Sequence, residues 1–316
     1  MGQGFAFVNG LYCSIEEAKI SALDPGFTHS DVVYDVTSTW QGRFFRLDEH
    51  IERFRASCAG FRIQMTCSSS ELKRILANCV ERGGVGRASY CALVATRGPY
   101  SPEGARTRDI FTTTPTLLAY AIPYLWLADP EHQKKGAHLI VAKTPRIPSA
   151  CVNARYKNYH WGDFTQGKFE ARAAGADYAV HLSIDGHLTE GAGFNIFFVK
   201  EGRLYTPAHN ILEGITRRSI LELATGLGVP TEVGDFPPAA LRDADEAFMT
   251  STAGGVMPVV RVDDRVLGAG VPGRLSTELR GEYWRRREAG WLGTSITSLL
   301  ADTGTHEARK TWHESQ

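Results

Sequence analysis

One lysine, Lys157, stands between two tyrosines in the sequence Arg-Tyr-Lys-Asn-Tyr of residues 155–159, just before a predicted helix over 161–173. An amine among aromatic side chains loses part of its hydration. This loss disfavours the charged form and makes the amine a better nucleophile toward an aldehyde. The alternative is a solvated lysine at the start of a helix, because most lysines lie on the surface. Other features of the chain must decide between the two interpretations.

A carboxylate lies beside two glycines in residues 188–195, between two predicted strands. Gly191 and Gly193 would let the backbone pass close to a flat ligand. A fixed Glu190 carboxylate could then stabilise a protonated ring nitrogen. The alternative is a turn with an exposed acid.

Two further segments could bind an anion. Residues 212–216, Leu-Glu-Gly-Ile-Thr, open a predicted helix, where free N–H groups and the helix dipole favour negative charge. Residues 250–255, Thr-Ser-Thr-Ala-Gly-Gly, could add hydroxyl and amide donors. An ordinary capped helix and a plain turn after a strand are the alternatives.

Several other kinds of site lack their motifs. The chain has no G-x-x-x-x-G-K-[ST], no H-E-x-x-H and no G-x-S-x-G, and no G-x-G-x-x-G follows a strand. Six cysteines form no C-x-x-C pair, so we expect free, buried thiols and no metal site.

Charge and hydropathy limit the partners. The 316 residues include 35 Lys plus Arg and 35 Asp plus Glu, which gives no global attraction to nucleic acid or anionic lipid. Apolar runs are too short to span a bilayer, and the first ten residues lack the features of an export signal. We therefore expect a cytoplasmic protein that binds neither nucleic acid nor membrane.

Hydrophobic periodicity predicts the elements that position these segments. Asn-Gly at 9–10 and Gln-Gly at 41–42 favour tight hairpin turns between flanking strands. Asp48 is predicted to cap one helix, and Ser68 with Glu71 forms a capping box for a second. Strands are predicted at 5–8, 11–13, 32–40, 44–45, 88–96, 117–124, 137–143, 178–182, 194–199 and 247–250, and later helices at 161–173, 217–225 and 276–287.

The composition turns polar between Leu127 and Lys135, as in a short interdomain connection. We predict a small N-terminal domain over 1–126, a linker over 127–135, a large domain over 136–293 and a polar tail over 294–316. The elements follow no regular βαβ rhythm, which favours an α+β fold over a doubly wound sheet.

The four segments resemble, in order and approximate spacing, those of the fold type IV pyridoxal-phosphate enzymes. These include branched-chain aminotransferases, D-amino-acid transaminases and aminodeoxychorismate lyases. The resemblance spans about residues 7–287 and is closest to the (R)-selective amine transaminases. It is carried by Phe-Thr-His-Ser-Asp-Val-Val-Tyr-Asp-Val at 27–36, Tyr-Ala-Ile-Pro-Tyr-Leu-Trp at 120–126 and Lys-Asn-Tyr-His-Trp-Gly-Asp at 157–163. It implies a smaller α/β N-terminal domain and a larger cofactor-binding domain rich in β-structure.

The resemblance implies pyridoxal 5'-phosphate as the cofactor and a role for each segment. Lys157 would form the Schiff base, the internal aldimine, and then carry a proton between substrate and cofactor. Glu190 would pair with the pyridine nitrogen, and Arg53 would bind the phosphate. The rest of the phosphate cup would be Gly214, Ile215, Thr216 and Thr252.

The resemblance also implies a substrate pocket, whose aromatic and small residues suit an apolar substituent. Its matching positions are His29, Tyr34, Val36, Tyr90, Ala92 and Trp161. Arg106 or Arg108 could bind a substrate carboxylate, or either could be a solvated loop residue. Several (R)-selective amine transaminases carry an acidic or amide residue where this chain has Ala92, so that pocket could be roomier and more apolar.

The resemblance therefore predicts a transaminase that moves an amino group between an (R)-amine or D-amino acid and a keto acid such as pyruvate. It also implies a homodimer with the active site near the subunit interface. A branched-chain or D-amino-acid aminotransferase and an aminodeoxychorismate lyase share the fold and the lysine. A binding protein that kept the scaffold without the cofactor is the alternative that is not an enzyme.

Overall fold

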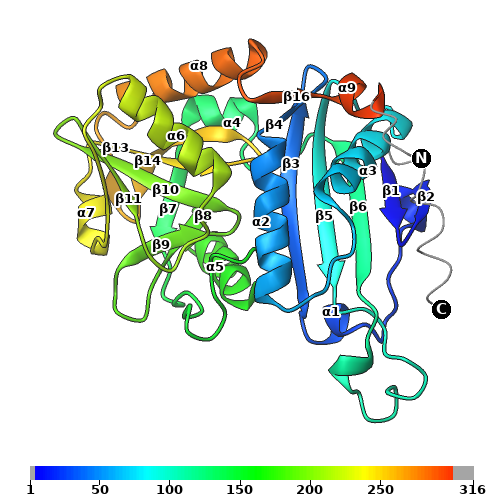
Figure 1. Ribbon diagram of the computed structural model, residues 1–316. Helices are drawn as coiled ribbons and strands as arrows, with labels where there is room; N and C mark the ends of the chain where they lie inside the picture. Colours follow the sequence, from blue (N-terminus) through cyan, green and yellow to red (C-terminus); the bar gives the residue numbers. More distant parts are fainter. Residues whose placement is uncertain (1–3, 302–316) are drawn as a thin grey trace. The chain divides into compact units, whose positions relative to one another are not determined.

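The computed structural model describes residues 4–301, which divide into two compact units (Figure 1). Within the described residues, the first unit comprises 4–125, 156–159 and 290–301, and the second comprises 126–155 and 160–289. The chain thus leaves the first unit after Leu125 and returns to it twice. The predicted domain limits treated residues 136–293 as one piece and did not anticipate these returns.

A seven-stranded antiparallel sheet forms the first unit, in the order β16-β4-β3-β5-β6-β1-β2. All nine residues of β3 (Val32–Trp40) pair with β5 (Ala88–Thr96), which pairs in turn with β6 (Thr116–Pro123). The shorter strands are β1 (Phe5–Val8), β2 (Leu11–Ser14), β4 (Arg43–Phe45) and β16 (Gly293–Ser295). The predicted hairpins at 5–13 and 32–45 are confirmed.

Two long helices, α2 (Leu47–Gly60) and α3 (Ser69–Arg82), cover one face of this sheet (Figure 1). Phe54 and Leu76 from the helices and Val33 and Leu93 from the strands are buried in one core. Since side chains alternate along a strand, the neighbours of Val33 and Leu93 in sequence face the other side of the sheet. The short helices of this unit are η1 (Ile15–Glu17), α1 (Pro25–Thr28), η2 (Ile110–Thr112) and α9 (Ile296–Ala301).

The helix starts show one correct and one wrong prediction. The Ser68 capping box is present, with both reciprocal hydrogen bonds to Glu71. Asp48 does not cap α2, because the N-cap is Arg46 in the left-handed conformation, with φ at +49°. Asp48 lies in the first turn instead, where a carboxylate also interacts favourably with the helix dipole.

The second unit is built on nine strands in the order β12-β11-β10-β13-β14-β7-β8-β9, with β15 paired to β14. The last strand, β9, also pairs with β10, so six of the strands form a closed ring. Parallel pairs join β7 to both β8 and β14, and β11 to β12. The strands are β7 (Ala137–Val141), β8 (Tyr178–Leu182), β9 (Leu188–Gly191), β10 (Phe194–Lys200), β11 (Arg203–Pro207), β12 (Thr231–Gly234), β13 (Glu246–Ser251), β14 (Gly255–Val262) and β15 (Arg265–Val266).

The three long helices of the second unit are α5 (Gly162–Ala173), α6 (Ile215–Gly226) and α8 (Arg274–Glu288), close to their predicted limits. Shorter helices are α4 (Pro130–Lys135) and α7 (Pro238–Arg242). Helix α4 occupies most of the predicted linker. Asp129 caps this helix by accepting a hydrogen bond from the His132 backbone N–H. The polar residues of the predicted linker thus belong to a capped helix.

The predicted tail contributes to the first unit where it is described. Strand β16 pairs with β4, and Ile296 of α9 is buried in the core of that unit. Residues 302–316, the rest of the predicted tail, lie outside the described residues.

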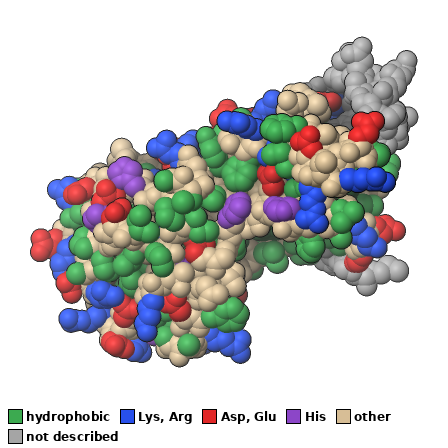
Figure 2. Space-filling model, turned by 90° about the horizontal axis from the view of Figure 1, so that it is seen from below, with side chains coloured by type: hydrophobic (Ala, Val, Ile, Leu, Met, Phe, Trp, Pro, Cys, Tyr) green, Lys and Arg blue, Asp and Glu red, His purple; other side chains and the backbone are tan. Residues whose placement is uncertain are grey.

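The surface and the cysteines agree in part with the sequence analysis. Figure 2 shows acidic and basic side chains interspersed over the face in view. All six cysteines are free, but Cys151 is exposed and Cys13 only half-buried, so burial of every thiol was a wrong prediction. Within residues 4–301, no helix is long and apolar enough to cross a membrane.

The start of α8 depends on a carboxylate from a neighbouring strand. Glu246 of β13 accepts hydrogen bonds from the backbone N–H groups of Leu275 (3.1 Å) and Ser276 (2.9 Å). Glu246→Ala should therefore lower the free energy of unfolding by about 1–2 kcal/mol, and Glu246→Gln should lose less. The urea midpoint measures this, with the exposed Glu232→Ala as control, and equal midpoints for the two alanine variants would contradict it.

Candidate active site

The backbone of Lys157 is held by two elements of the first unit. Its N–H donates to Ser57 Oγ on α2 (3.0 Å), and its carbonyl accepts from the Tyr34 N–H on β3 (3.0 Å). A bridge between Asn158 and Val33 continues the pairing. Because β4 pairs with β3 only at residues 39–40, residues 157–158 bond to the edge that β4 leaves open. The backbone of Lys157 is thus fixed by sheet pairing although it lies in a loop.

A glycine on α2 makes room for the residue before the lysine. The Tyr156 ring lies against Gly60 so closely that a Cβ at Gly60 would meet ring atoms at 2.3–2.5 Å. Any larger side chain at this position would push Tyr156 away, and with it the neighbouring Lys157.

The Lys157 amine lies over an aromatic ring. Its Nζ is 4.4 Å from the centroid of the Tyr34 ring, and Tyr159 stacks on Tyr34 with centroids 4.2 Å apart. Burial raises the pKa of Tyr34 well above its usual value, so its phenol stays protonated at neutral pH. The predicted aromatic surroundings of Lys157 are therefore present in the structure.

Arg53 is oriented by a buried acid that sequence analysis did not assign a role. Its Nε and Nη2 donate to the two Asp35 oxygens at 2.7 and 2.9 Å, and His50 Nδ1 lies 2.7 Å from Asp35 Oδ1. Burial opposes ionisation of Asp35, yet Arg53 and His50 outweigh it and lower the pKa of this carboxyl. Burial lowers the pKa of His50, so a neutral imidazole donates its Nδ1 proton to Asp35. The signal in the sequence was the alternation of β3, which turns Asp35 toward α2.

The predicted pocket residues of β3 and β5 share one sheet face. Val36 lies opposite Ala92 in the register, and Ser38 lies opposite Tyr90. Opposed residues of an antiparallel pair point to the same side, as do residues two apart, so Tyr34 belongs to the same face. This face is the one that α2 and α3 do not cover.

The other predicted pocket residues of the first unit are exposed. His29 ends α1, with its Nδ1 2.8 Å from Thr28 Oγ1. Arg106 and Arg108 lie in the loop between β5 and β6, and neither forms an ion pair with any residue in 4–301.

In the second unit, Glu190 lies within strand β9, where sequence analysis placed a segment between strands. The side chain is 5% exposed, so an exposed acid on a turn is excluded. Its Oε2 accepts from the Leu212 N–H (2.9 Å) and its Oε1 from Arg146 Nη2 (3.1 Å). Asn195 Nδ2, 3.4 Å from Oε2, links the carboxylate to the next strand.

The predicted anion-binding helix begins where expected. Gly214 is the N-cap of α6, and Ile215 and Thr216 are its first residues, both buried. A Cβ at Gly214 would lie 2.1 Å from Asn195 Oδ1, so only glycine lets the helix start so close to the Glu190 contacts. Twelve residues of α6 give this N-terminus a full helix dipole.

Thr252 and Trp161 complete the predicted residues of the second unit. Thr252 lies in the turn between β13 and β14, half-buried. Trp161 is the N-cap of α5 and packs edge-on against Phe164. Two residues that the sequence did not predict, Arg146 and Asp163, contact each other at 2.5 Å beside Glu190.

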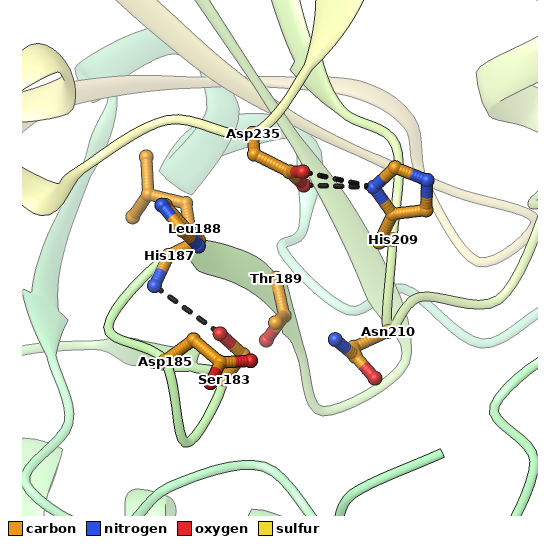
Figure 3. A pocket seen from close by; sticks show the side chains of 8 residues that line it. All are labelled: Ser183, Asp185, His187, Leu188, Thr189, His209, Asn210 and Asp235. Carbon is orange, nitrogen blue, oxygen red and sulfur yellow. Dashed lines mark hydrogen bonds and ion pairs between the residues drawn. The ribbon is translucent and has the colours of Figure 1, made fainter. Parts of the chain in front are cut away.

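A separate polar cavity of about 210 Å³ lies in the second unit (Figure 3). Its lining includes Thr189 and the pair of His209 and Asp235, which are 2.9 Å apart. Because Thr189 and Glu190 are adjacent in a strand, their side chains point to opposite faces of β9. The cavity therefore lies on the face away from the Glu190 carboxylate.

Comparison with known proteins decides the family. The family model described as Amino-transferase class IV matches residues 32–262. The chain belongs to this family. It is a pyridoxal-phosphate-dependent aminotransferase of the branched-chain or D-amino-acid type, and the predicted α+β fold in two domains is confirmed.

Three similar proteins illustrate the range of the family. The D-alanine aminotransferase of Bacillus licheniformis is 32% identical over 275 residues, covering 86% of this chain and 93% of that protein. The structure of a branched-chain amino acid aminotransferase from T.th. with pyridoxamine 5'-phosphate has a TM-score of 0.85 and 31% identity, covering 94% and 99% of the two chains. A branched-chain aminotransferase from Thermoproteus uzoniensis with norvaline has a TM-score of 0.83 and 27% identity, covering 92% and 99%.

The buried His50 should make stability depend on pH. In the unfolded chain a histidine titrates near pH 6.5, whereas the folded pKa is lower. The unfolded state therefore binds more protons, and His50 lowers stability as the pH falls below about 6.5. The His50→Asn variant keeps a donor near the Nδ1 position but does not titrate. Between about pH 7.5 and 5.5, its free energy of unfolding should therefore fall by roughly 1 kcal/mol less than that of the wild type. Urea unfolding at both pH values measures the difference, and parallel losses would show that His50 does not titrate on unfolding.

Proposed function

We propose that this aminotransferase moves an amino group between an (R)-amine or D-amino acid and a keto acid such as pyruvate, and that Lys157 and Glu190 contact its cofactor. The observation that carries the proposal is the position of Lys157. Its backbone is fixed by sheet pairing, its amine is flanked by aromatic rings, and an apolar sheet face lies beside it. The family resemblance supplies the roles.

The described residues suit the parts of pyridoxal phosphate. A phosphate dianion fits the N-terminus of α6 at Gly214, Ile215 and Thr216, where backbone N–H groups and the Thr216 hydroxyl can donate. Arg53 adds a full positive charge, and its hydrogen bond to Asp35 fixes the orientation of the guanidinium group. We assign Thr252 a further donor role.

Bound pyridoxal phosphate supplies an aldehyde that bonds reversibly to amines and a ring that accepts electrons. Lys157 would offer its amine to that aldehyde and would hold and move a proton at its Nζ. The backbone contacts to Ser57 and Tyr34 fix the backbone position from which this amine extends. The task of Glu190 is to hold a proton on the ring nitrogen, which a buried and ionised carboxylate can do.

Substrate preference follows from the sheet face of the first unit that α2 and α3 do not cover. Tyr34, Val36 and Ala92 are buried and lack charge, and Tyr90 is half-buried. Such a surface accepts an aryl or alkyl substituent more readily than a charged one. We include His29 and Trp161 in the pocket, and leave Arg106 or Arg108 to bind the carboxylate of a keto acid.

A second candidate is a branched-chain or D-amino-acid aminotransferase, because both activities occur in the names of similar proteins. The same apolar face would hold a leucine side chain.

We also propose that the enzyme is a homodimer, which sedimentation would show as twice the 34.7 kDa of one chain.

The stereochemistry of the donor separates the two candidates. With racemic 1-phenylethylamine and pyruvate, the enzyme should consume the (R) enantiomer and leave the (S) enantiomer, as chiral chromatography would measure. The resemblance to (R)-selective amine transaminases gives the expected enantiomer, and the uncharged surface at Tyr90 and Ala92 suits the phenyl and methyl groups of this amine. Preferred turnover of leucine or D-glutamate over the amine would favour the second candidate.

The role of Lys157 has a spectroscopic test. The purified protein with pyridoxal phosphate should show a visible absorbance band that borohydride removes, with the tag mapping to the peptide of Lys157. Lys157→Ala should lose the band, while the exposed Lys134→Ala, as matched control, should keep it. A borohydride tag on another residue would refute the assignment.

A further inference from the structure

Arg146 bridges two buried carboxylates of the second unit. Its Nη2 lies 3.1 Å from Glu190 Oε1, and its Nη1 lies 2.5 Å from Asp163 Oδ2. Arg146 is 9% exposed, Glu190 is 5% exposed and Asp163 is 6% exposed. Removing one partner of ion pairs this deep is costly, because the remaining charge is left buried and unpaired.

The guanidinium of Arg146 is immobilised on several sides. Its Cζ lies 4.0 Å from the centroid of the Phe164 ring, and the Arg146 backbone N–H donates to the Leu182 carbonyl. Asp163 Oδ2 also accepts from the Ile147 N–H (2.9 Å), so the acid is itself fixed to the Arg146 segment. The charge that reaches Glu190 is therefore held in place by contacts within the protein.

Only donors reach Glu190 in the hydrogen bonds described above. Arg146 approaches Oε1, and the Leu212 N–H and the Asn195 amide approach Oε2. These contacts all favour the ionised carboxylate, because each would meet a weaker acceptor in the protonated acid.

We propose that Arg146 is a positioning residue that keeps Glu190 ionised and thereby keeps the proton of the Glu190–pyridine contact on the ring nitrogen. The proposal rests on the proposed function of Glu190. Arg146 itself touches neither substrate nor cofactor in this role.

Electrostatics gives the direction of the effect. A proton shared between a pyridine nitrogen and a carboxylate has two locations: on the ring, which creates an ion pair, or on the acid, which leaves two neutral groups. A fixed positive charge beside the carboxylate stabilises the ion pair, because the negative end lies nearer to it. Without that charge, a buried carboxylate takes up the proton, and the ring loses its capacity to accept electrons.

The other charged groups around Glu190 do not replace Arg146. Arg217 of α6 is near enough to interact electrostatically with Glu190, but its hydrogen bonds go to Thr206 Oγ1 and the Pro207 carbonyl. His181 of β8 packs on Phe164, and burial lowers the pKa of its imidazole, so it adds no positive charge at neutral pH. Asp163 adds negative charge that Arg146 already meets.

The test uses the holoenzyme loaded with pyridoxal phosphate labelled with ¹⁵N in the ring, whose NMR shift reports protonation of that nitrogen. Arg146→Met should move the resonance from the protonated to the unprotonated position and lower kcat at least about tenfold, with cofactor retained. Arg146→Gln, which keeps an amide donor in case the Met variant fails to fold, should shift it in the same direction. Arg146→Lys, which keeps the charge, should restore the protonated resonance.

Two controls separate this role from simple structural damage. Arg242→Met removes a guanidinium from another ion pair of the same unit, that with Asp263, and should leave the resonance at the wild-type position. Arg146→Met in a Glu190→Gln background should leave the resonance where Glu190→Gln alone places it, since both changes act on one contact.

The outcomes distinguish the inference from the function on which it rests. A protonated ring nitrogen in both Arg146→Met and Arg146→Gln would overturn the role of Arg146 alone. A wild-type protein whose ring nitrogen does not respond to Glu190→Gln would overturn the role of Glu190 and this inference together. A further shift in the double variant would show that Arg146 acts elsewhere.

Discussion

The open edge of β3 is the constraint on which the first unit depends. Strand β4 pairs with β3 only at its far end, so the backbone N–H groups near Tyr34 need another partner. The chain supplies one by returning from the second unit for four residues, 156–159. Since unpaired buried backbone groups are costly, this return is fixed by the sheet, and Lys157 is held with it. The backbone at Lys157 is thereby fixed as in a strand, although it lies in a loop.

Buried charge organises the candidate residues of each unit in the same manner. In the first unit, Asp35 orients Arg53, and His50 completes the contacts of Asp35. In the second, Asp163 and Phe164 orient Arg146, which contacts Glu190. In each case an arginine fork holds a carboxylate that would otherwise lose its charge on burial. Arg53 and Glu190, which contact the cofactor in our proposal, are thus each held by neighbouring buried charges.

The sequence was sufficient to predict most elements of the first unit and the long helices of the second, because periodicity and capping residues are local signals. Strand β9 was missed because its four residues, which end in Gly191, are too few to show an alternation of apolar and polar residues. Glu190 was therefore not placed in a strand. Asp35 was visible only as part of a motif, and its partner His50 lies 15 residues away. Arg146 lay in a proline-containing segment without regular structure. Such pairings depend on how distant segments pack, which spacing along the chain does not encode. The return of residues 156–159 to the first unit was hidden for the same reason.

The closed ring of six strands in the second unit also limits how this protein can vary. A turn such as residues 183–187 can absorb an inserted residue, but an insertion inside β9 would rotate every following side chain to the opposite face. Glu190 would then point toward the polar cavity, and Thr189 would take its place opposite Leu212. Gly191 further limits which residues β9 tolerates, because a Cβ there would lie 2.1 Å from the Phe194 ring and 2.4 Å from the Ala179 carbonyl oxygen. Evolution can therefore lengthen the loops around this acid far more easily than it can alter the short strand that carries it.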